Sequence, residues 1–417
     1  ALLAPLATPA TLALVDEHEP AHKPPGAPRL HSRDIVLARG ARERGAVVLT
    51  SATPSVETWW RADNGHEDRD AHSGRVGRVA RDIAAPGPWP SVTLADTRGI
   101  LRREPLTPAL ARAVREALAR GRRVLLVVGR LTSALACDEC GEIFRCPECA
   151  LALAWSRAGR RLDCRLCGRS LPPPETCPTC RGRRLSPFGW GAERVEHAVR
   201  RRFPRARIAR WEGDGARRRT RRTPPASADA DIVIGTRAAL RLFGPGALGC
   251  AGFVTPDQLL RLPDFRAGER LLEVLWAAAE RIGANGTLVI QSQNTGHYAF
   301  DAVARQDLSA FYRREIPLRA ELGYPPFRRL ALLTVDAAHA GGAGARALAD
   351  EVGAALRASP ALTVYPALTD RRGRRARLVV KGGEDLPRVL GAALEEFRAP
   401  RPRGIIEVEV DPVEWPS

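Results

Sequence analysis

The sequence contains no methionine and almost no lysine, which stands only at Lys23 and Lys381 among the 417 residues. Nearly all of the positive charge is therefore arginine, and the formal net charge is +18 at pH 7. A chain this basic attracts polyanions, and nucleic acid is the usual one. The same pattern is also typical of a GC-rich genome, in which Arg and Ala codons accumulate without selection for a ligand. Charge alone leaves both interpretations open.

Long apolar runs are absent as well. No stretch approaches the roughly 18 apolar residues of a membrane span. The uncharged opening stretch, 1–15, holds Pro5 and Pro9 and lacks the basic segment with which a secretory signal begins. We therefore expect no membrane association and a cytoplasmic, nucleoid-associated location. Because that stretch leads directly into Val15-Asp16-Glu17, which reads as the end of a buried strand, we also expect the chain to be the C-terminal piece of something longer.

Eight of the nine cysteines form four C-x2-C pairs within one short segment. They are Cys137, Cys140, Cys146, Cys149, Cys164, Cys167, Cys177 and Cys180. A C-x2-C pair on a tight turn places two thiolates on one edge of a tetrahedral zinc ion, and two pairs complete a four-thiolate site. Four pairs therefore predict two zinc ions. No histidine lies among them, so both sites are expected to be closed and structural rather than catalytic.

Other uses of paired cysteines fit this pattern less well. Disulfides are rare in a reducing compartment. A thioredoxin-like redox centre uses one C-x2-C pair at the start of a helix rather than four in a row. An iron–sulfur cluster also takes four thiolates, and spacing alone does not exclude it. The remaining cysteine, Cys250, ends a stretch of small residues and is expected to be a buried apolar residue.

The segments on both sides of the cysteine cluster have the pattern of an α/β protein. Thr107 and Pro108 predict the start of a helix that ends at Gly121, and a second helix is expected over 193–202. From residue 326 the order strand, helix, strand, strand, helix, strand predicts a βαββαβ domain of ferredoxin-like arrangement. Short apolar runs predict a buried parallel strand at 46–50, a buried strand at 124–128 and further strands at 231–234 and 288–291.

Three short motifs of DNA helicases occur in the expected order along the chain. Val15-Asp16-Glu17 matches the approach to a Walker B motif, Ser51-Ala52-Thr53 matches motif III, and Ile234-Gly235-Thr236 matches motif V. Together with the eight-cysteine spacing, these segments resemble the PriA family, the replication-restart DNA helicases also called primosomal protein N-prime. The resemblance covers essentially the whole chain and corresponds to the C-terminal part of that family. The cysteine spacing is its most specific element.

The resemblance implies an α/β fold with two RecA-like helicase lobes, the first of them partial, an inserted all-cysteine two-zinc module and a C-terminal βαββαβ domain. The expected boundaries are 1–63 for the remnant of the first lobe, 64–105 for a linker, 106–136 and 185–300 for the second lobe, 137–184 for the two-zinc module, 301–325 for a second linker and 326–417 for the C-terminal domain. In the family the cysteine pairs interleave. One zinc would then take Cys137, Cys140, Cys177 and Cys180, and the other Cys146, Cys149, Cys164 and Cys167.

The motifs that would run an ATP-dependent motor depart from the family pattern. No G-x-x-x-x-G-K-[ST] phosphate loop occurs in this chain, and Asp16-Glu17-His18-Glu19 misplaces the histidine of the Asp-Glu-x-His motif. Ala278 stands at the first arginine-finger position of motif VI, and only Arg281 remains. Such a finger is commonly worth about 10³–10⁵ in rate. We therefore expect no catalytic residues, with Asp16, Glu17 and Arg281 vestigial, and no binding of ATP with Mg²⁺.

The function that the resemblance implies is replication restart without helicase activity of its own. Such a protein would bind abandoned or stalled DNA forks and help reload the replicative helicase. Its expected partners are branched or forked DNA, single-stranded-DNA-binding protein, other primosome components and the replicative helicase, and we expect a monomer. Two alternatives stay open: an active ATP-dependent 3′→5′ DNA helicase whose P-loop lies upstream of this chain, and a zinc-ribbon nucleic-acid adaptor unrelated to restart.

The expected DNA contacts are one aromatic residue and one arginine cluster. Aromatic rings stack on unpaired bases, and guanidinium groups bind phosphates. The aromatic residue is Trp155, in the cysteine module. The cluster comprises Arg371, Arg372, Arg374, Arg375 and Arg377, and the family resemblance implies that its domain binds branched DNA.

Overall fold

In the computed structural model of the chain, contacts divide the molecule into two compact units. Unit 1 contains residues 1–84, 166–168 and 312–417, and unit 2 contains 85–165 and 169–311. The residues that the structure describes are 11–24, 26, 29–43, 45–64, 68–69, 76–77, 87–98, 104–129, 134–137, 139–140, 142–148, 152–156, 160–164, 168–188, 192–211, 229–260, 264–336, 344–369, 375–398 and 405–413. Among them, no helix is both long and apolar enough to cross a membrane.

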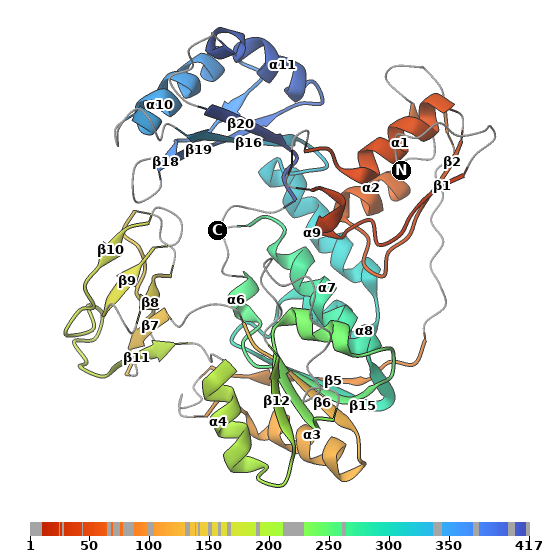
Figure 1. Cartoon of the computed structure of the whole chain (residues 1–417), viewed down its shortest axis with the longest axis vertical. Helices are drawn as coiled ribbons and strands as arrows, with labels where there is room; N and C mark the ends of the chain where they lie inside the picture. Colours follow the sequence, from red (N-terminus) through yellow and green to blue (C-terminus); the bar gives the residue numbers. More distant parts are fainter. Residues whose placement is uncertain are drawn as a thin grey trace. The chain divides into compact units, whose positions relative to one another are not determined.

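The centre of unit 2 is a six-stranded parallel sheet (Figure 1). Its strands lie in the order β12-β13-β6-β14-β15-β5. Their bounds are Ile208–Trp211 for β12, Ile232–Gly235 for β13, Arg123–Val127 for β6, Leu248–Phe253 for β14, Ile282–Ser292 for β15 and Ser91–Asp96 for β5. Every residue of β13 is buried, as expected for a central strand that is covered on both faces.

Helices cover both faces of this sheet. They are α3 (Pro108–Ala119), α4 (Ala192–Arg202), α6 (Asp257–Leu260), α7 (Ala267–Glu280) and α8 (Tyr298–Arg305), with a 3-10 helix η2 (Arg237–Leu242). The predicted start of α3 is confirmed: Thr107 Oγ1 accepts a hydrogen bond from the Leu110 N–H at 3.2 Å, and Pro108 occupies the first turn. A free N–H at a helix start is satisfied in this way.

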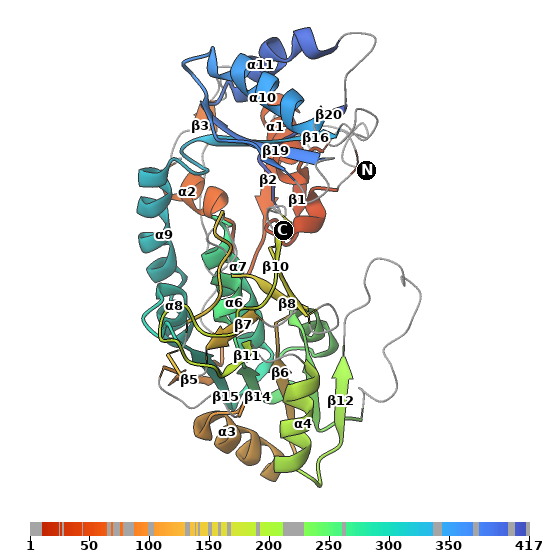
Figure 2. The same ribbon diagram turned by 90° about the vertical axis from the view of Figure 1, so that its left-hand side faces the viewer.

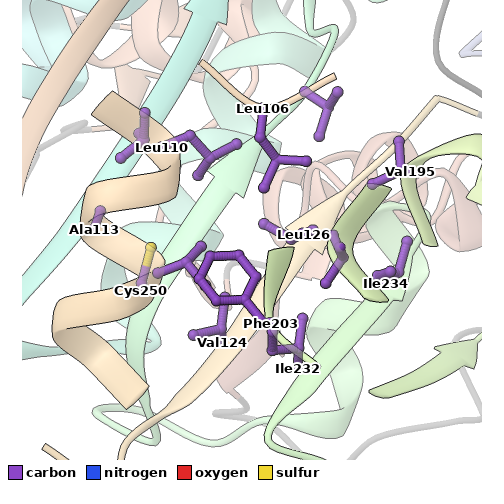
Figure 3. Close-up of a cluster of buried hydrophobic side chains, with 14 of the residues drawn as sticks. Leu106, Leu110, Ala113, Val124, Leu126, Val195, Phe203, Ile232, Ile234 and Cys250 are labelled. Carbon is purple, nitrogen blue, oxygen red and sulfur yellow. The ribbon is translucent and has the colours of Figure 1, made fainter. Parts of the chain in front are cut away.

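The main core of unit 2 lies between the sheet and the two helices α3 and α4 (Figure 3). Leu110 from α3, Val195 from α4 and Ile232 from β13 are each fully buried there. Cys250 is fully buried in the same cluster, so its predicted role as an apolar core residue is confirmed. Burial raises the pKa of its thiol to about 12.

The cysteine segment forms a separate antiparallel sheet, with strands in the order β10-β9-β8-β7-β11. Their bounds are Ser170–Leu171 for β10, Arg161–Asp163 for β9, Ala154–Ser156 for β8, Ala134–Cys137 for β7 and Leu185–Phe188 for β11. The first strand, β7, pairs with the last, β11, in the register Cys137↔Leu185. The two ends of the segment therefore lie side by side. This allows the segment to be inserted in the chain between strand β6 and helix α4 without separating them.

The first part of unit 1 contains two parallel strands and two helices. Strands β1 (Thr11–Leu14) and β2 (Ala46–Leu49) pair with each other, and the helical elements are η1 (Pro20–His22), α1 (Ser32–Glu43) and α2 (Val56–Asn64). Helix α9 (Leu308–Leu322) belongs to this unit from Tyr312 onward, and this part packs against α2: the rings of Trp59 and Tyr312 stack with their centroids 4.0 Å apart.

The C-terminal part of unit 1 is an antiparallel sheet with two helices on one face (Figure 2). The elements run β16 (Arg329–Asp336), α10 (Gly344–Arg357), β17 (Thr363–Val364), β18 (Leu368–Thr369), β19 (Arg375–Gly382), α11 (Leu386–Ala393), η3 (Glu395–Arg398) and β20 (Ile405–Val410). The sheet order β17-β19-β16-β20, with the extra strand β18 paired to β19, is the ferredoxin-like order. The predicted βαββαβ arrangement is confirmed.

Both stretches that were expected to be linkers contain regular structure. Within 64–105, β5 is a strand of the parallel sheet and pairs with β15, and β3 (Asp68–Arg69) pairs with β4 (Val76–Gly77). Within 301–325, residues 301–305 form the end of α8, and residues 308–322 form α9. The remaining domain boundaries stay a prediction.

Candidate metal centre

Four of the predicted zinc ligands converge in unit 2. The Sγ atoms of Cys137 and Cys180 are 3.5 Å apart, those of Cys140 and Cys177 are 3.6 Å apart, and all four lie within 4.8 Å of one another. Thiolates at about 2.3 Å from one tetrahedral zinc would be separated by about 3.8 Å. A disulfide would need about 2.05 Å, and these four cysteines form none. The donor set can therefore hold one metal ion, and it suits zinc.

The two turns that carry these cysteines close in the same way. The Cys137 N–H donates to the Glu142 carbonyl at 2.8 Å, and the Cys177 N–H donates to the Gly182 carbonyl at 2.8 Å. In each turn the acceptor lies five residues after the first cysteine. The pairing of β7 with β11 then brings the two turns together. We call each such turn a knuckle.

Backbone N–H groups point at each of the four sulfurs. The Glu139 N–H donates to Cys137 Sγ at 3.4 Å, and Glu142 and Gly182 donate to Cys140 and Cys180. Such donors stabilise thiolates, the form that binds metal. They also make the site ready for a cation without any further side chain.

The four thiols do not ionise equally easily. Burial raises the pKa of Cys177, but hydrogen bonds from the N–H groups of Cys180 and Thr179 outweigh it and lower the pKa to about 7. A hydrogen bond from the Gly182 N–H lowers the pKa of Cys180. The contacts of the Cys180 thiol with Cys140 and with the other two thiols outweigh this effect and raise the pKa of Cys180 to about 12. Charges this close repel one another, so full ionisation of the set requires a bound cation.

A metal held by these four cysteines would have a structural role. Cys137 and Cys177 are fully buried, whereas Cys140 and Cys180 are exposed. Four thiolates complete a tetrahedral shell and leave no position for a substrate. When bound, the metal would cross-link β7 to the turn before β11.

The second predicted zinc set lies partly outside the described residues, which do not include Cys149 or Cys167. Cys146 and Cys164 are both buried, with 1% and 2% of their surface exposed. The Cys164 N–H donates to the Arg169 carbonyl at 2.7 Å, again five residues after the first cysteine. Three of the four C-x2-C turns are therefore each closed by the same kind of hydrogen bond, from the first cysteine N–H to the carbonyl five residues later.

Of the three residues predicted to be vestigial motor residues, Glu17 and Arg281 have internal partners. Glu17 has 1% of its surface exposed, and its carboxylate accepts hydrogen bonds from the Ser55 N–H at 2.6 Å, from Ser55 Oγ at 3.0 Å and from Arg33 Nη1 at 3.0 Å. Asp16 is exposed and has a positive φ of 52°. In unit 2, Arg281 donates to the carbonyls of Leu240 at 2.8 Å and Ala277 at 2.6 Å. The sequence offered no signal for the Arg33 and Ser55 contacts, because the partners come from three separate segments.

The expected DNA contacts are only partly described. Trp155 is half-buried in β8, opposite Leu162 of β9. Arg375 is exposed on β19 and pairs with Asp336 at 2.7 Å, and Arg377 is half-buried opposite Thr334. Arg371, Arg372 and Arg374 lie outside the described residues. Their role in DNA binding stays a prediction.

Comparison with known proteins identifies the class of the C-terminal domain. Residues 320–413, which include the whole βαββαβ unit, match the family model described as Primosomal protein N C-terminal domain. The chain therefore carries a domain of primosomal proteins, combined with a parallel α/β sheet and a four-cysteine centre.

Several curated proteins similar to this chain are replication restart proteins named PriA. The one from Bacillus subtilis is 28% identical, with 99% of this chain and 52% of that protein aligned. The one from Treponema pallidum is 30% identical over 99% of this chain and 64% of that protein, and the one from Thermotoga maritima is 28% identical over 72% and 41%. The chain spans about half the length of the curated relatives it matches. It is related to PriA over nearly its whole length, and the predicted resemblance is confirmed.

Proposed function

We propose that this chain serves in replication restart, where it binds abandoned or stalled DNA forks and helps reload the replicative helicase. The observation that carries the proposal is the alignment of 99% of the chain with proteins named replication restart protein PriA. The primosomal C-terminal domain at 320–413 supports it, and so does the net charge of +18, which favours a polyanionic partner. A monomer in the cytoplasm, associated with the nucleoid, completes the proposal.

The cysteine module would act as a docking surface with two structural zinc ions. Cys137, Cys140, Cys177 and Cys180 would hold the first, and Cys146, Cys149, Cys164 and Cys167 the second. The repeated closure of three knuckles supports a second site built like the first. Partners of this surface would be other primosome components, the replicative helicase and single-stranded-DNA-binding protein. The division into a partial first RecA-like lobe and a second lobe interrupted by the module belongs to the same proposal.

This role would not include a motor driven by this chain. The Glu17 carboxylate is already engaged by Ser55 and Arg33, so it is poorly placed to orient water for ATP hydrolysis. Ala278 is fully buried in α7 and offers no guanidinium, and Arg281 is held by two carbonyls. These contacts favour structural roles for the residues that remain.

The proposal can be tested by measuring binding of the full chain to forked and linear duplex DNA across a salt series, with ATP turnover followed in the same samples. We expect preference for the fork and no turnover, and affinity should fall as salt rises because bound phosphates release counterions. Equal binding to both DNAs would point instead to a general zinc-ribbon adaptor. DNA-stimulated turnover that Glu17→Gln abolishes would establish an active helicase.

A further inference from the structure

A glutamate occupies the same position in two of the four cysteine pairs. Glu139 directly precedes Cys140, the second cysteine of its pair, and Glu148 directly precedes Cys149. These two pairs belong to different zinc sets. In each set the glutamate side chain contacts the other knuckle of that set. Its partners are the residue whose carbonyl closes that knuckle and, in the first set, also a residue two positions later.

In the first set the contact partner is Gly182. A Cβ atom added at Gly182 would lie 2.5 Å from Glu139 Cδ and 2.6 Å from its Oε2, so the carboxylate fills the space that a side chain would take. The Gly182 carbonyl closes the Cys177 knuckle. Arg184 accompanies the contact, with its Nε 3.7 Å from Glu139 Oε1. The Cys137 knuckle therefore touches the residue that closes its partner.

In the second set the contact partner is Arg169. Its guanidinium forms an ion pair with the Glu148 carboxylate, and its carbonyl closes the Cys164 knuckle by accepting the Cys164 N–H at 2.7 Å. Arg169 lies five residues after Cys164, as Gly182 lies five residues after Cys177. The same placement therefore recurs in a second pair of knuckles.

We propose that each zinc site has an outer clasp, formed by Glu139 with Gly182 and Arg184 in one site and by Glu148 with Arg169 in the other. The clasp holds the two knuckles of a site together and slows the loss of zinc. It also favours the combination of the Cys146 pair with the Cys164 pair. This inference rests on the proposed two-zinc module and assigns positioning residues to it.

The arginines are needed because of the charge of the centre. Four thiolates around one Zn²⁺ carry an excess negative charge of about two units, so a bare carboxylate beside them is repelled. Arg169 and Arg184 neutralise that carboxylate. Outer-shell partners of metal ligands commonly change metal affinity about 10- to 100-fold, but exposed ion pairs contribute less. Because the Arg169 and Glu148 side chains are 44% and 61% exposed, we expect an effect of about 3- to 10-fold.

The first test uses the full, zinc-loaded chain and follows the rate of zinc transfer to a coloured chelator. The single changes Glu148→Arg and Arg169→Glu should each release one zinc about 3- to 10-fold faster. The charge swap Glu148→Arg with Arg169→Glu should restore the original rate. Arg183→Glu is the matched control, because Arg183 is exposed in the same module and has no ion pair among the described residues. It should leave both rates unchanged.

The second test addresses the site formed by Cys137, Cys140, Cys177 and Cys180, with a substitution that leaves the net charge unchanged. Gly182→Ala should displace the Glu139 carboxylate, which is the movable end of a flexible side chain, and should speed release of the other zinc. In the background of Glu139→Ala the same change should have no further effect, because the carboxylate is already gone.

The outcomes separate the clasp from the proposed module. The clasp alone would be overturned if elemental analysis finds two zinc ions and the single variants release zinc no faster than Arg183→Glu. It would also be overturned if the charge swap releases zinc as fast as the single changes. A chain purified without zinc that takes up none would overturn both. Two ions, faster release in the single variants and recovery in the swap would establish the clasp.

Discussion

Replacing Glu17 by glutamine separates a structural role from a catalytic one. The side chain keeps its shape but loses its charge, and its new NH2 group must face either the Ser55 N–H or Arg33, both of which are donors. A hydrogen bond to a charged group contributes about 1.5–3 kcal/mol, and breaking a buried ion pair costs about 3–5 kcal/mol. Arg33 has 13% of its side chain exposed and Glu17 has 1%. The expected loss in free energy of unfolding is therefore about 2–4 kcal/mol.

Hydrogen exchange of the full chain measures this loss where it should occur. Protection of amides in α1 and α2 should fall about 30-fold or more, since each 1.4 kcal/mol is a factor of ten, while the strands of unit 2 keep their protection. Asp16→Asn is the control, because it removes the same charge from an exposed neighbour whose left-handed backbone asparagine tolerates. Unchanged protection in the Glu17 variant, together with loss of an ATP turnover present in the original chain, would refute the structural assignment.

Three other perturbations have expected outcomes. Removal of zinc with a chelator should abolish exchange protection over 134–188 and leave the β16–β20 domain folded, as measured by the same method; an unchanged module without metal would contradict a structural site. Zinc affinity, measured by chelator competition, should fall as pH is lowered from 8 to 6, because zinc must release the proton of Cys180, whose pKa is raised to about 12, at every pH in this range, and must also release the proton that Cys177, whose pKa is about 7, takes up as the pH falls. Leu110→Ala should lower the free energy of unfolding of unit 2 by about 3 kcal/mol in denaturant titration, since Leu110 is fully buried; the control Leu94→Ala, at a residue of the same unit that is 37% exposed, should lower it less.

The local features of this protein follow from short stretches of sequence. Each described C-x2-C turn is closed by a hydrogen bond to a residue only five positions later, so the geometry that brings its two thiols together is local. For this reason the spacing of the cysteines alone predicted a metal centre. Thr107 and Pro108 specify the start of α3 through one hydrogen bond three residues away. The C-terminal strands and helices are long enough for their apolar periodicity to predict the βαββαβ order, and the sheet has that order.

Helix α9 was missed because its buried face is only partly apolar: Phe311 is fully buried, but charged residues are buried beside it. Tyr312, Glu315 and Arg319 are buried, whereas Leu318 and Leu322 are 44% and 58% exposed. Arg319 pairs with Glu315 at 2.9 Å and with Glu57 at 3.8 Å, and it donates a hydrogen bond to the Pro325 carbonyl at 3.3 Å. An apolar pattern cannot indicate a helix whose packing depends on an ion pair with a residue more than two hundred positions away.

The sequence by itself therefore determined the cysteine knuckles, the βαββαβ order of the C-terminal domain and the kinship with replication restart proteins. Tertiary structure alone decided which distant segments meet: β5 with β15, Glu17 with Ser55 and Arg33, and Glu148 with Arg169. The physical reason is range. Turns, caps and periodicity act within a few residues, whereas parallel strand pairing and buried ion pairs form only when the chain brings separate segments together.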